Sequence, residues 1–388
     1  MVDIVIGMQF GDEGKGKIVD YLADNYDVIA RFGGGDNAGH TLYKDGEKIV
    51  LHNIPSGILN SDKINIIGNG CVINPISFMK EVKELESKGI DVRSNLVISD
   101  KAHVITPIHI EWDRFNESQR SDKIGTTMKG IGPCYTDKVS RKGLMVKDVI
   151  RSDFNSWGVK MNNQIGLPFD VPSLTEFYKA IEFLKQFQIR ETEILINELL
   201  DYGKKVLAEG AQAFGLDIDF GTYPYVTSSV TSVAGVCQGL GVSPKRIGKI
   251  YGVIKAYTTR VGNGPFDTEL FDEDGNKMCQ IGNEFGSTTG RKRRCGWLNL
   301  DEVKRAVTIC GVDELIMTKV DVLNGFERVS ILINGELLDL PGWDSSVSIH
   351  LSEFISKVSE YVKSPITYIS NGVNKNDMKK VDVLSDHI

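Results

Sequence analysis

The chain has 388 residues, of which 41% are hydrophobic and 25% charged, and its formal net charge is −7 at pH 7. This length can bury a large core, and the acidic balance argues against a nucleic-acid partner. Its 6 cysteines form no C-x-x-C pair, which argues against a zinc site or a disulfide framework. No long uncharged apolar run and no signal-peptide pattern occur, so we expect a cytoplasmic protein without a membrane partner.

The chain begins with an apolar stretch, residues 2–8, that predicts a strand. The glycine- and lysine-rich residues 11–17 follow, and then an amphipathic stretch that predicts a helix. A strand, such a loop and a helix N-terminus form a phosphate cradle, because backbone N–H groups and the positive end of the helix face the anion. The loop matches G-x-x-x-x-G-K, but Ile18 stands where a P-loop has the Ser or Thr that holds Mg²⁺. The nearest substitute is an acid inside the loop, Asp12.

A second predicted strand, residues 28–32, leads into a glycine cluster that ends at His40. A functional histidine and an ordinary hydrogen-bonded loop histidine fit this spacing equally well. A carboxylate among cradle glycines would repel phosphate unless it held a cation or moved a proton, so we interpret Asp12 as functional. Asp12 and His40 end successive βα-type segments, so we expect both to face one crevice at the carboxyl edge of the sheet.

Helix and strand signals alternate along the rest of the chain. Asn74 and Pro75 predict a helix start, and Ser173 with Glu176 predicts a capping box. Further helices are predicted at 193–202 and 350–362, strands at 315–317, 328–333 and 366–369, and a hairpin turn at 334–335.

This alternation predicts an α/β fold: a predominantly parallel central sheet flanked by helices, with a P-loop-like nucleotide-binding architecture and elaborated loops. No repeat or linker divides the chain, so we expect a single domain over residues 1–388. We interpret residues 153–172, rich in Asn, Gly and Pro, as an excursion from that domain.

The turn at residues 318–321 follows a predicted buried strand and has the sequence TKVD. In GTP-binding proteins an Asn-Lys-x-Asp turn at such a place reads guanine. The carboxylate of Asp321 would accept from the ring N–H and the exocyclic amine, and the stem of Lys319 would cover the base. With Thr in place of Asn, an ordinary turn at a strand end fits as well. Ser370 and Gly372, after the last strand, are candidates for contacts to the same base.

Two further loops carry residues suited to anions. Residues 291–294 read RKRR after two hydroxyls and a glycine. They suit a nuclear-localisation or nucleic-acid patch, or a clamp on a small dianion, since arginine forks match carboxylates. Residues 125–133, rich in glycine and hydroxyls, suit another phosphate, although alone they fit any turn.

Together and in this order, the segments resemble the adenylosuccinate synthetase family along essentially the whole chain. The resemblance rests on residues 11–17, 37–41, 54–57, 125–133, 137–139, 209–212, 221–228, 259–262, 288–291 and 318–321. It implies a ligase that forms a C–N bond in AMP biosynthesis. Such an enzyme joins IMP and L-aspartate at the expense of GTP, through a 6-phosphoryl-IMP intermediate, with Mg²⁺.

The resemblance also implies catalytic roles, for Asp12, Lys15, His40 and Gln212. Asp12 would take the proton from the purine ring nitrogen, so that the 6-oxygen attacks the γ-phosphate. Lys15 would contact the β- and γ-phosphates, and His40 would donate to the phosphoryl group in transfer. Asp12 and the carbonyl of Gly39 would ligate Mg²⁺.

The implied binding residues fall into three sets. GTP would contact Gly11, Glu13, Gly14, Lys15, Gly16, Lys17, Gly39, His40, Thr41, Lys319, Asp321, Ser370 and Gly372. IMP would contact Asp12, Asn37, Thr127, Gln212, Thr227 and Arg291, with Arg141 supplied by a second copy in a homodimer. L-aspartate would contact Thr288, Thr289, Arg291 and Arg293.

The chain departs from the family pattern in several places. It is shorter than typical bacterial members around 155–201 and 325–343, Ala213 replaces a usual glycine, and Val373 replaces a proline. A viral branch acts on deoxyguanylate and tends to lose the loop aspartate. The presence of Asp12 favours IMP, with dGMP or GMP as the alternative substrate.

Two other classes of function remain as alternatives. A regulatory GTPase would account for the Gly-Lys loop and the TKVD turn, but not for Asp12 or for the separate loops at 125–133 and 288–294. A nucleic-acid-binding protein is disfavoured by the net charge of −7 and by the lack of aromatic residues among the basic ones.

Overall fold

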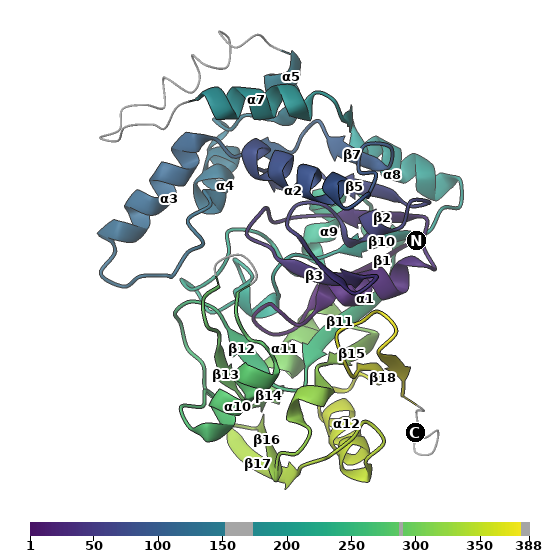
Figure 1. Ribbon diagram of the computed structural model, residues 1–388, viewed down its shortest axis with the longest axis vertical. Helices are drawn as coiled ribbons and strands as arrows, with labels where there is room; N and C mark the ends of the chain where they lie inside the picture. The colour runs from purple at the N-terminus through teal and green to yellow at the C-terminus, as the bar shows by residue number, and fades with distance from the viewer. Residues whose placement is uncertain (152–173, 287–289, 382–388) are drawn as a thin grey trace.

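The computed structural model describes residues 1–151, 174–286 and 290–381, which are built around a 10-stranded sheet (Figure 1). In their order across the sheet, the strands are β19 (Met378–Lys380), β18 (Ile366–Ser370), β15 (Glu314–Thr318), β11 (Ile247–Lys255), β1 (Val2–Gly7), β10 (Val206–Glu209), β2 (Val28–Arg31), β5 (Ile64–Ile67), β7 (Leu96–Ser99) and β9 (Gln188–Arg190). All neighbouring pairs run parallel except β18 and β19.

The helices pack on the sheet and around both of its ends (Figure 1). Those of the described residues are α1 (Lys15–Ala23), α2 (Pro75–Ser87), α3 (Pro107–Gln119), α4 (Ile131–Ser140), α5 (Val146–Arg151), α7 (Thr175–Leu184), α8 (Thr192–Asp201), α9 (Ala234–Leu240), α10 (Glu273–Ile281), α11 (Leu300–Cys310) and α12 (Ile349–Val362). In Figure 1, α2, α3, α4, α5 and α7 gather around one end of the sheet, and α10, α11 and α12 around the other. The predicted parallel sheet flanked by helices is confirmed.

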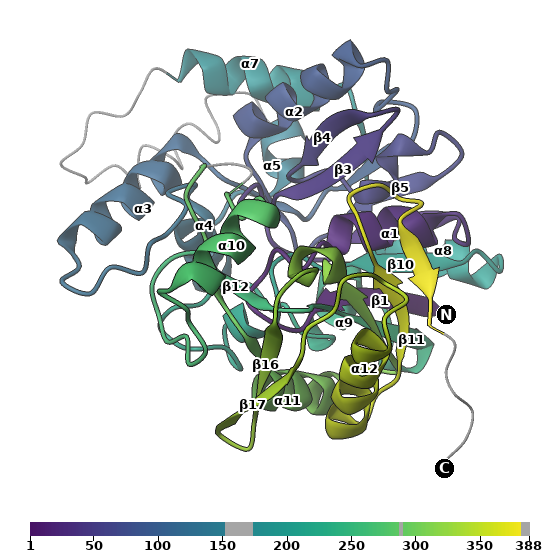
Figure 2. The same ribbon diagram turned by 60° about the horizontal axis from the view of Figure 1, so that its bottom comes forward.

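Smaller elements complete the described chain. They are the hairpin β3 (His40–Lys44) and β4 (Glu47–Leu51), the pair β6 (Val72–Ile73) and β8 (His103–Val104), the pair β12 (Thr258–Arg260) and β13 (Arg294–Gly296), the sheet β14 (Leu298–Asn299), β16 (Arg328–Ile333) and β17 (Glu336–Pro341), and the 3₁₀ turns η1 (Ser56–Leu59), η2 (Phe214–Leu216), η3 (Pro244–Arg246) and η4 (Val320–Leu323). Strand β3 packs on α1 (Figure 2).

The central strands are apolar because both faces of the sheet are covered. Every residue of β2, β7 and β10 is buried, and so is all of β1 except Asp3. The apolar faces of α11 and α12 pack in the same core cluster as β1 and β15. This burial fixes the positions of the strand ends, from which the loops of the site begin.

Local sequence signals account for several of these elements. The Asn74 side chain accepts hydrogen bonds from Ile76 N at 3.1 Å and Ser77 N at 3.4 Å, as expected of a residue that caps α2. The φ angles of Asn334 and Gly335 are 52° and 78°, which is the left-handed conformation that their hairpin turn requires. The predicted capping box at Ser173 and the excursion at 153–172 lie outside the described residues.

The structure corrects the expectation for the segment after β2. We expected a βα-type unit, but the hairpin of β3 and β4 follows, and His40 is its first residue. The signal was the pair Asp45-Gly46, at φ 52° and 82°, between two alternating stretches. Strand β10 also separates β1 from β2, so its last residue, Glu209, lies between the two expected segments.

The described helices include none with the length and hydropathy that a membrane span requires.

Candidate active site

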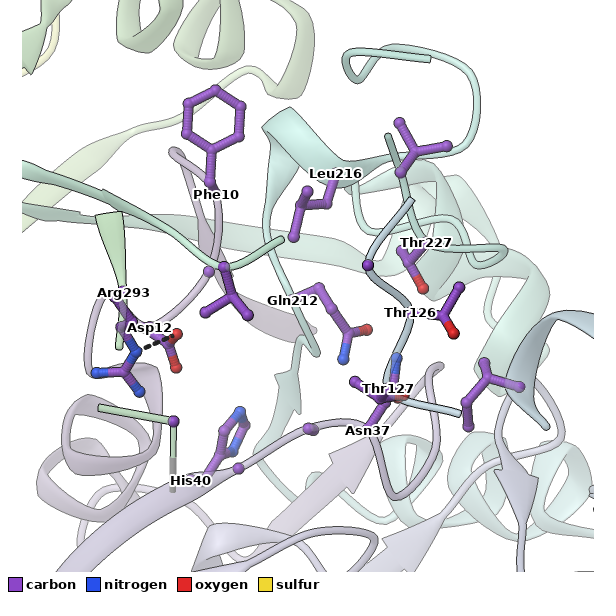
Figure 3. A pocket seen from close by; sticks show the side chains of 18 of the residues that line it. Phe10, Asp12, Asn37, His40, Thr126, Thr127, Gln212, Leu216, Thr227 and Arg293 are labelled. Carbon is purple, nitrogen blue, oxygen red and sulfur yellow. Dashed lines mark ion pairs between the residues drawn. The ribbon is translucent and has the colours of Figure 1, made fainter. Parts of the chain in front are cut away.

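A cavity of about 1410 Å³ lies at the carboxyl edge of the central sheet. Its walls include the loops that follow five parallel strands, β1, β2, β10, β15 and β18, and residues of the helices α3 and α4. The carboxyl ends of parallel strands meet at one edge, which is where α/β proteins bind ligands. In Figure 3, Asp12 lies on one side of the cavity and Asn37, Thr127 and Thr227 on the other, with Gln212 between them.

Most residues expected in the site line this cavity. They are Gly11, Asp12, Gly14, Lys15, Gly16, Lys17, Asn37, Gly39, His40, Thr41, Thr127, Arg141, Gln212, Thr227, Arg293, Lys319, Asp321, Ser370 and Gly372. Arg291 lines an adjoining cavity of about 300 Å³, which shares Gly125 and Asn263 with the larger one. Glu13 is buried beside the large cavity, and Thr288 and Thr289 lie outside the described residues.

The phosphate loop binds a carboxylate of its own chain, that of Glu13. The Glu13 carboxylate accepts from Gly11 N at 2.8 Å and from Gln9 N at 3.3 Å, and it pairs with Lys15 Nζ at 2.6 Å. A Cβ on Gly7 would lie 2.4 Å from Glu13 Oε2, so this position needs glycine. The loop N–H groups and Lys15 are therefore arranged around negative charge, as a phosphate cradle requires.

His40 packs directly against the phosphate loop. A Cβ on Gly16 would lie 2.7 Å from the Cβ of His40, so only glycine permits this approach. His40 Nδ1 lies 2.5 Å from Glu209 Oε1, and Glu209 also accepts from Ser56 N and Oγ, both at 2.7 Å. Burial lowers the pKa of His40 although the Glu209 carboxylate opposes this. A neutral ring then donates through Nδ1 and keeps Nε2 for the cavity.

Asp12 is held by an arginine from the far half of the chain. The Nε atom of Arg293 lies 2.8 Å from Asp12 Oδ2 (Figure 3), and its NH1 donates to Glu284 Oε2 at 2.6 Å. Asp12 itself has a φ of 60°, and its side chain is 26% exposed toward the cavity. The carboxylate is thus reachable from the cavity and lies against a buried cation.

The part of the cavity wall that Asp321 and Lys319 form is arranged for a nucleobase. Asp321 lines it, burial raises the pKa of this carboxyl, and its buried Oδ1 accepts no hydrogen bond from the described residues. Lys319, at φ 58°, extends its side chain so that Nζ donates to Gly282 O at 2.8 Å. An unsatisfied acceptor beside a lysine stem suits a base that presents N–H groups.

Lys17 ties the phosphate loop to the loop after β18. Its Nζ donates to Ser370 Oγ at 2.7 Å and to Gly372 O at 2.8 Å. Burial lowers the pKa of Lys17 to about 8, against the opposing effect of Asp377 and Asp321. Lys17 is therefore a cation at neutral pH that loses its charge in mildly alkaline solution.

The oxygen atoms at the phosphate loop suit a divalent cation that also binds phosphate oxygens of a substrate. The described residues contain no group of three or more His, Cys, Asp or Glu side chains that could hold a metal. Asp12 and Gly39 both line the cavity and supply a carboxylate and a carbonyl oxygen. Mg²⁺ prefers such oxygens, takes few protein ligands and completes its shell with water and substrate phosphates.

Two acids of the site were missed by sequence reasoning. Glu209 was noted only as part of a motif, and Glu284 was not singled out at all. The available signal was an ionisable residue at the end of the apolar strand β10 for Glu209, and a lone acid just before a basic loop for Glu284. Both are fully buried, so their role depends on which cations the fold brings to them.

Comparison with known proteins gives consistent results. The family model of adenylosuccinate synthetase matches residues 4–341. In an alignment of 381 positions, the chain is 50% identical to adenylosuccinate synthetase of Bacteroides fragilis, and the alignment covers 91% of this chain and 90% of that protein.

Two solved structures are similar as well. Fully ligated adenylosuccinate synthetase from Plasmodium falciparum has a TM-score of 0.92 and 36% identity, covering 98% of this chain and 100% of its own. Succinoaminodeoxyadenylate synthetase of cyanophage S-2L, bound to dGMP and dATP, has a TM-score of 0.70 and 19% identity, covering 98% of this chain and 95% of its own. The second similarity shows a common fold.

Removing the Glu209 carboxylate should cost stability, because it leaves Ser56 and His40 with buried donors and no acceptor. We expect Glu209→Ala to lower the free energy of unfolding by about 3 kcal/mol or more. Urea denaturation measures the change. The exposed Glu336, replaced in the same way, should change it by less than about 0.5 kcal/mol. Equal losses for both variants would contradict this role of Glu209.

Affinity for inorganic tripolyphosphate should depend on the charge of Lys17. Because a polyanion favours the protonated lysine, the affinity of the wild-type protein relative to Lys17→Met should fall as pH rises through about 8, by up to about 10-fold per pH unit. Calorimetric titration of both proteins between about pH 7 and pH 9 measures this ratio, and the ligand's own titration cancels in it. A ratio that stays constant with pH would contradict the prediction.

Proposed function

The chain belongs to the adenylosuccinate synthetase family, and from this premise we propose how its residues carry out the reaction. The protein is a ligase that joins IMP and L-aspartate through a C–N bond in purine nucleotide biosynthesis, with GTP as phosphoryl donor. Relatives named adenylosuccinate synthetase, such as the one at 50% identity, favour IMP over the dGMP or GMP alternative.

The observation that carries the proposed mechanism is the common cavity of Asp12, Lys15 and His40. Asp12 accepts the proton of the purine ring nitrogen, and the 6-oxygen of IMP then forms a bond to the γ-phosphorus while the bond to GDP breaks. The amine of L-aspartate next bonds to C6, and phosphate leaves with the former 6-oxygen. Positioning and charge neutralisation provide most of such catalysis.

Lys15 and His40 stabilise the negative charge on the phosphate groups during phosphoryl transfer. Lys15 is paired with Glu13 at 2.6 Å, and we propose that it exchanges this carboxylate for the β- and γ-phosphates of GTP. His40 is aligned through Nδ1 by Glu209, and we propose that its ring takes up a second proton when the polyphosphate binds, so that Nε2–H donates to the transferred phosphoryl group. Gln212 lies between Asp12 on one side and Asn37, Thr127 and Thr227 on the other (Figure 3), and it orients the purine.

GTP-dependent chemistry of this family generally needs a divalent metal. We propose Mg²⁺, held by the carboxylate of Asp12 and the carbonyl of Gly39. When bound, the cation would neutralise charge on the phosphate oxygens. The ion pair with Arg293 keeps the Asp12 carboxylate directed at that position.

The three substrates occupy neighbouring parts of the cavity in this proposal. Guanine lies on Lys319, Asp321, Ser370 and Gly372, and the phosphates lie on the loop of Gly11, Glu13, Gly14, Lys15, Gly16 and Lys17 with Gly39, His40 and Thr41. IMP lies on Asp12, Asn37, Thr127, Gln212, Thr227 and Arg291. L-aspartate lies on Thr288, Thr289, Arg291 and Arg293.

We further propose that the chain acts as a cytoplasmic homodimer of single domains. Residues from Phe10 to Val373 line one cavity, which supports a single functional unit. Arg141 is exposed at the end of α4, at the edge of the cavity, and Val139 beside it is 81% exposed. A second copy covering this edge would contribute its own Arg141 to the IMP site.

Replacing Asp12 should separate catalysis from nucleotide binding. We expect Asp12→Ala to lower kcat by at least about 1000-fold, because the base and a metal ligand are both lost. Its affinity for GTP should change by less than about 5-fold, since the loop N–H groups and Lys15 remain. Initial rates and calorimetric titration with GTP measure the two quantities. A variant that keeps near-normal kcat would overturn the proposed role.

Asp24 provides the matched control, since it is an exposed acid next to α1 that pairs with Lys375 at 2.9 Å. Asp24→Ala should leave kcat within about twofold of the wild-type value. Phosphate release from GTP should require both IMP and L-aspartate. Release that ignores L-aspartate would instead support a regulatory GTPase.

A further inference from the structure

A buried glutamate, Glu284, contacts two residues that line the active-site cavity but does not line it itself. It follows α10, and its side chain has no exposed surface. Its Oε1 accepts from Lys319 Nζ at 2.7 Å and from Lys255 Nζ at 3.3 Å. Its Oε2 accepts from Arg293 NH1 at 2.6 Å. Lys319 and Arg293 both line the cavity, so one buried carboxylate holds two residues of its wall.

The position of Arg293 depends on Glu284 through the backbone as well. The Arg293 N–H donates to Glu284 O at 2.9 Å, and Phe285 forms a bridge with Lys292. Glu284 and Arg293 therefore close the base of the loop between them. The other nitrogen of Arg293, Nε, pairs with Asp12 at 2.8 Å. A continuous chain of contacts thus runs from Lys319 through Glu284 and Arg293 to Asp12.

The charges make this chain of contacts sensitive to its geometry. Burial alone would raise the pKa of Glu284, but Lys255, Lys319 and Arg293 outweigh it and hold this pKa far below its usual range. Burial lowers the pKa of Lys255 to about 8. A buried carboxylate is stable only while its partners keep good geometry. Lys319 and Arg293 are thus restrained by the same buried carboxylate.

We propose that Glu284 is a positioning residue that couples the guanine site, through Lys319, to the amino-acid site, through Arg293. GTP immobilises Lys319, and Glu284 passes this restraint to Arg293, so that bound GTP strengthens the binding of L-aspartate. The coupling is reciprocal, as any linkage between two binding sites must be. This inference rests on the proposed placement of guanine at Lys319 and of L-aspartate at Arg293.

The test is the pattern of KM values in Glu284→Gln, which keeps the shape of the side chain and removes its charge. We expect KM for GTP and KM for L-aspartate each to rise about 10-fold, while KM for IMP stays within about twofold. Initial rates with both substrates varied should show that saturating GTP lowers KM for L-aspartate in the wild-type enzyme and does not in the variant. A merely structural role would lower the active fraction and leave this pattern unchanged.

Two further variants separate positioning from charge balance. Tyr257→Phe removes a neutral O–H that donates to the same Oε1 and keeps all charges, so the KM values should stay within about twofold. The double variant Glu284→Gln/Lys255→Met removes one cation together with the carboxylate. We expect it to regain thermal stability and to keep the raised KM values. Recovery of both KM values would show that Glu284 only balances charge, and would overturn the inference.

Single variants of Lys319 and of Arg293 test the proposed placements of GTP and of L-aspartate separately. Lys319→Met should raise KM for GTP, and Arg293→Lys should raise KM for L-aspartate. If either fails to do so, the proposed placement of that substrate is wrong. If both succeed while Glu284→Gln raises all three KM values equally or lowers only kcat, the placement stands and the coupling role of Glu284 is wrong.

Discussion

The ion pair between Asp12 and Arg293 is the interaction on which the arrangement of the site depends. Asp12 lies in a loop whose N–H groups and Lys15 are arranged around anions, and Arg293 reaches it from the far half of the chain at 2.8 Å. Glu284 holds Arg293 in turn at 2.6 Å. The pair therefore keeps a reactive carboxylate fixed and accessible, and it joins the phosphate loop to the segment proposed to bind the amino acid.

Backbone conformation makes this crowding of charged groups possible. Gly11 and Gly14 have φ angles of 92° and 84°, and Asp12 between them is held at 60°. Gly16 lets His40 approach to a distance that any side chain would block. In the proposed mechanism, the acid inside the loop takes the place of the hydroxyl that is missing after Lys17.

Elements with local signals could be predicted from the sequence, as α2 with its Asn74 cap and the turn at Asn334-Gly335 show. The phosphate loop was predictable because its chemistry lies within seven consecutive residues. Glu209 and Glu284 were not, because their partners are distant in sequence: His40 lies 169 residues from Glu209. The role of a buried acid depends on the cations that the tertiary fold places next to it.

The fate of the 6-oxygen of IMP tests the central claim most directly. If Asp12 prepares this oxygen to attack the γ-phosphorus, the oxygen must leave with phosphate when L-aspartate takes its place. With IMP labelled by heavy oxygen at the 6-position, mass spectrometry should find the label in the phosphate released with each turnover. Unlabelled phosphate, formed while the label appears in water or stays on the purine, would contradict the claim.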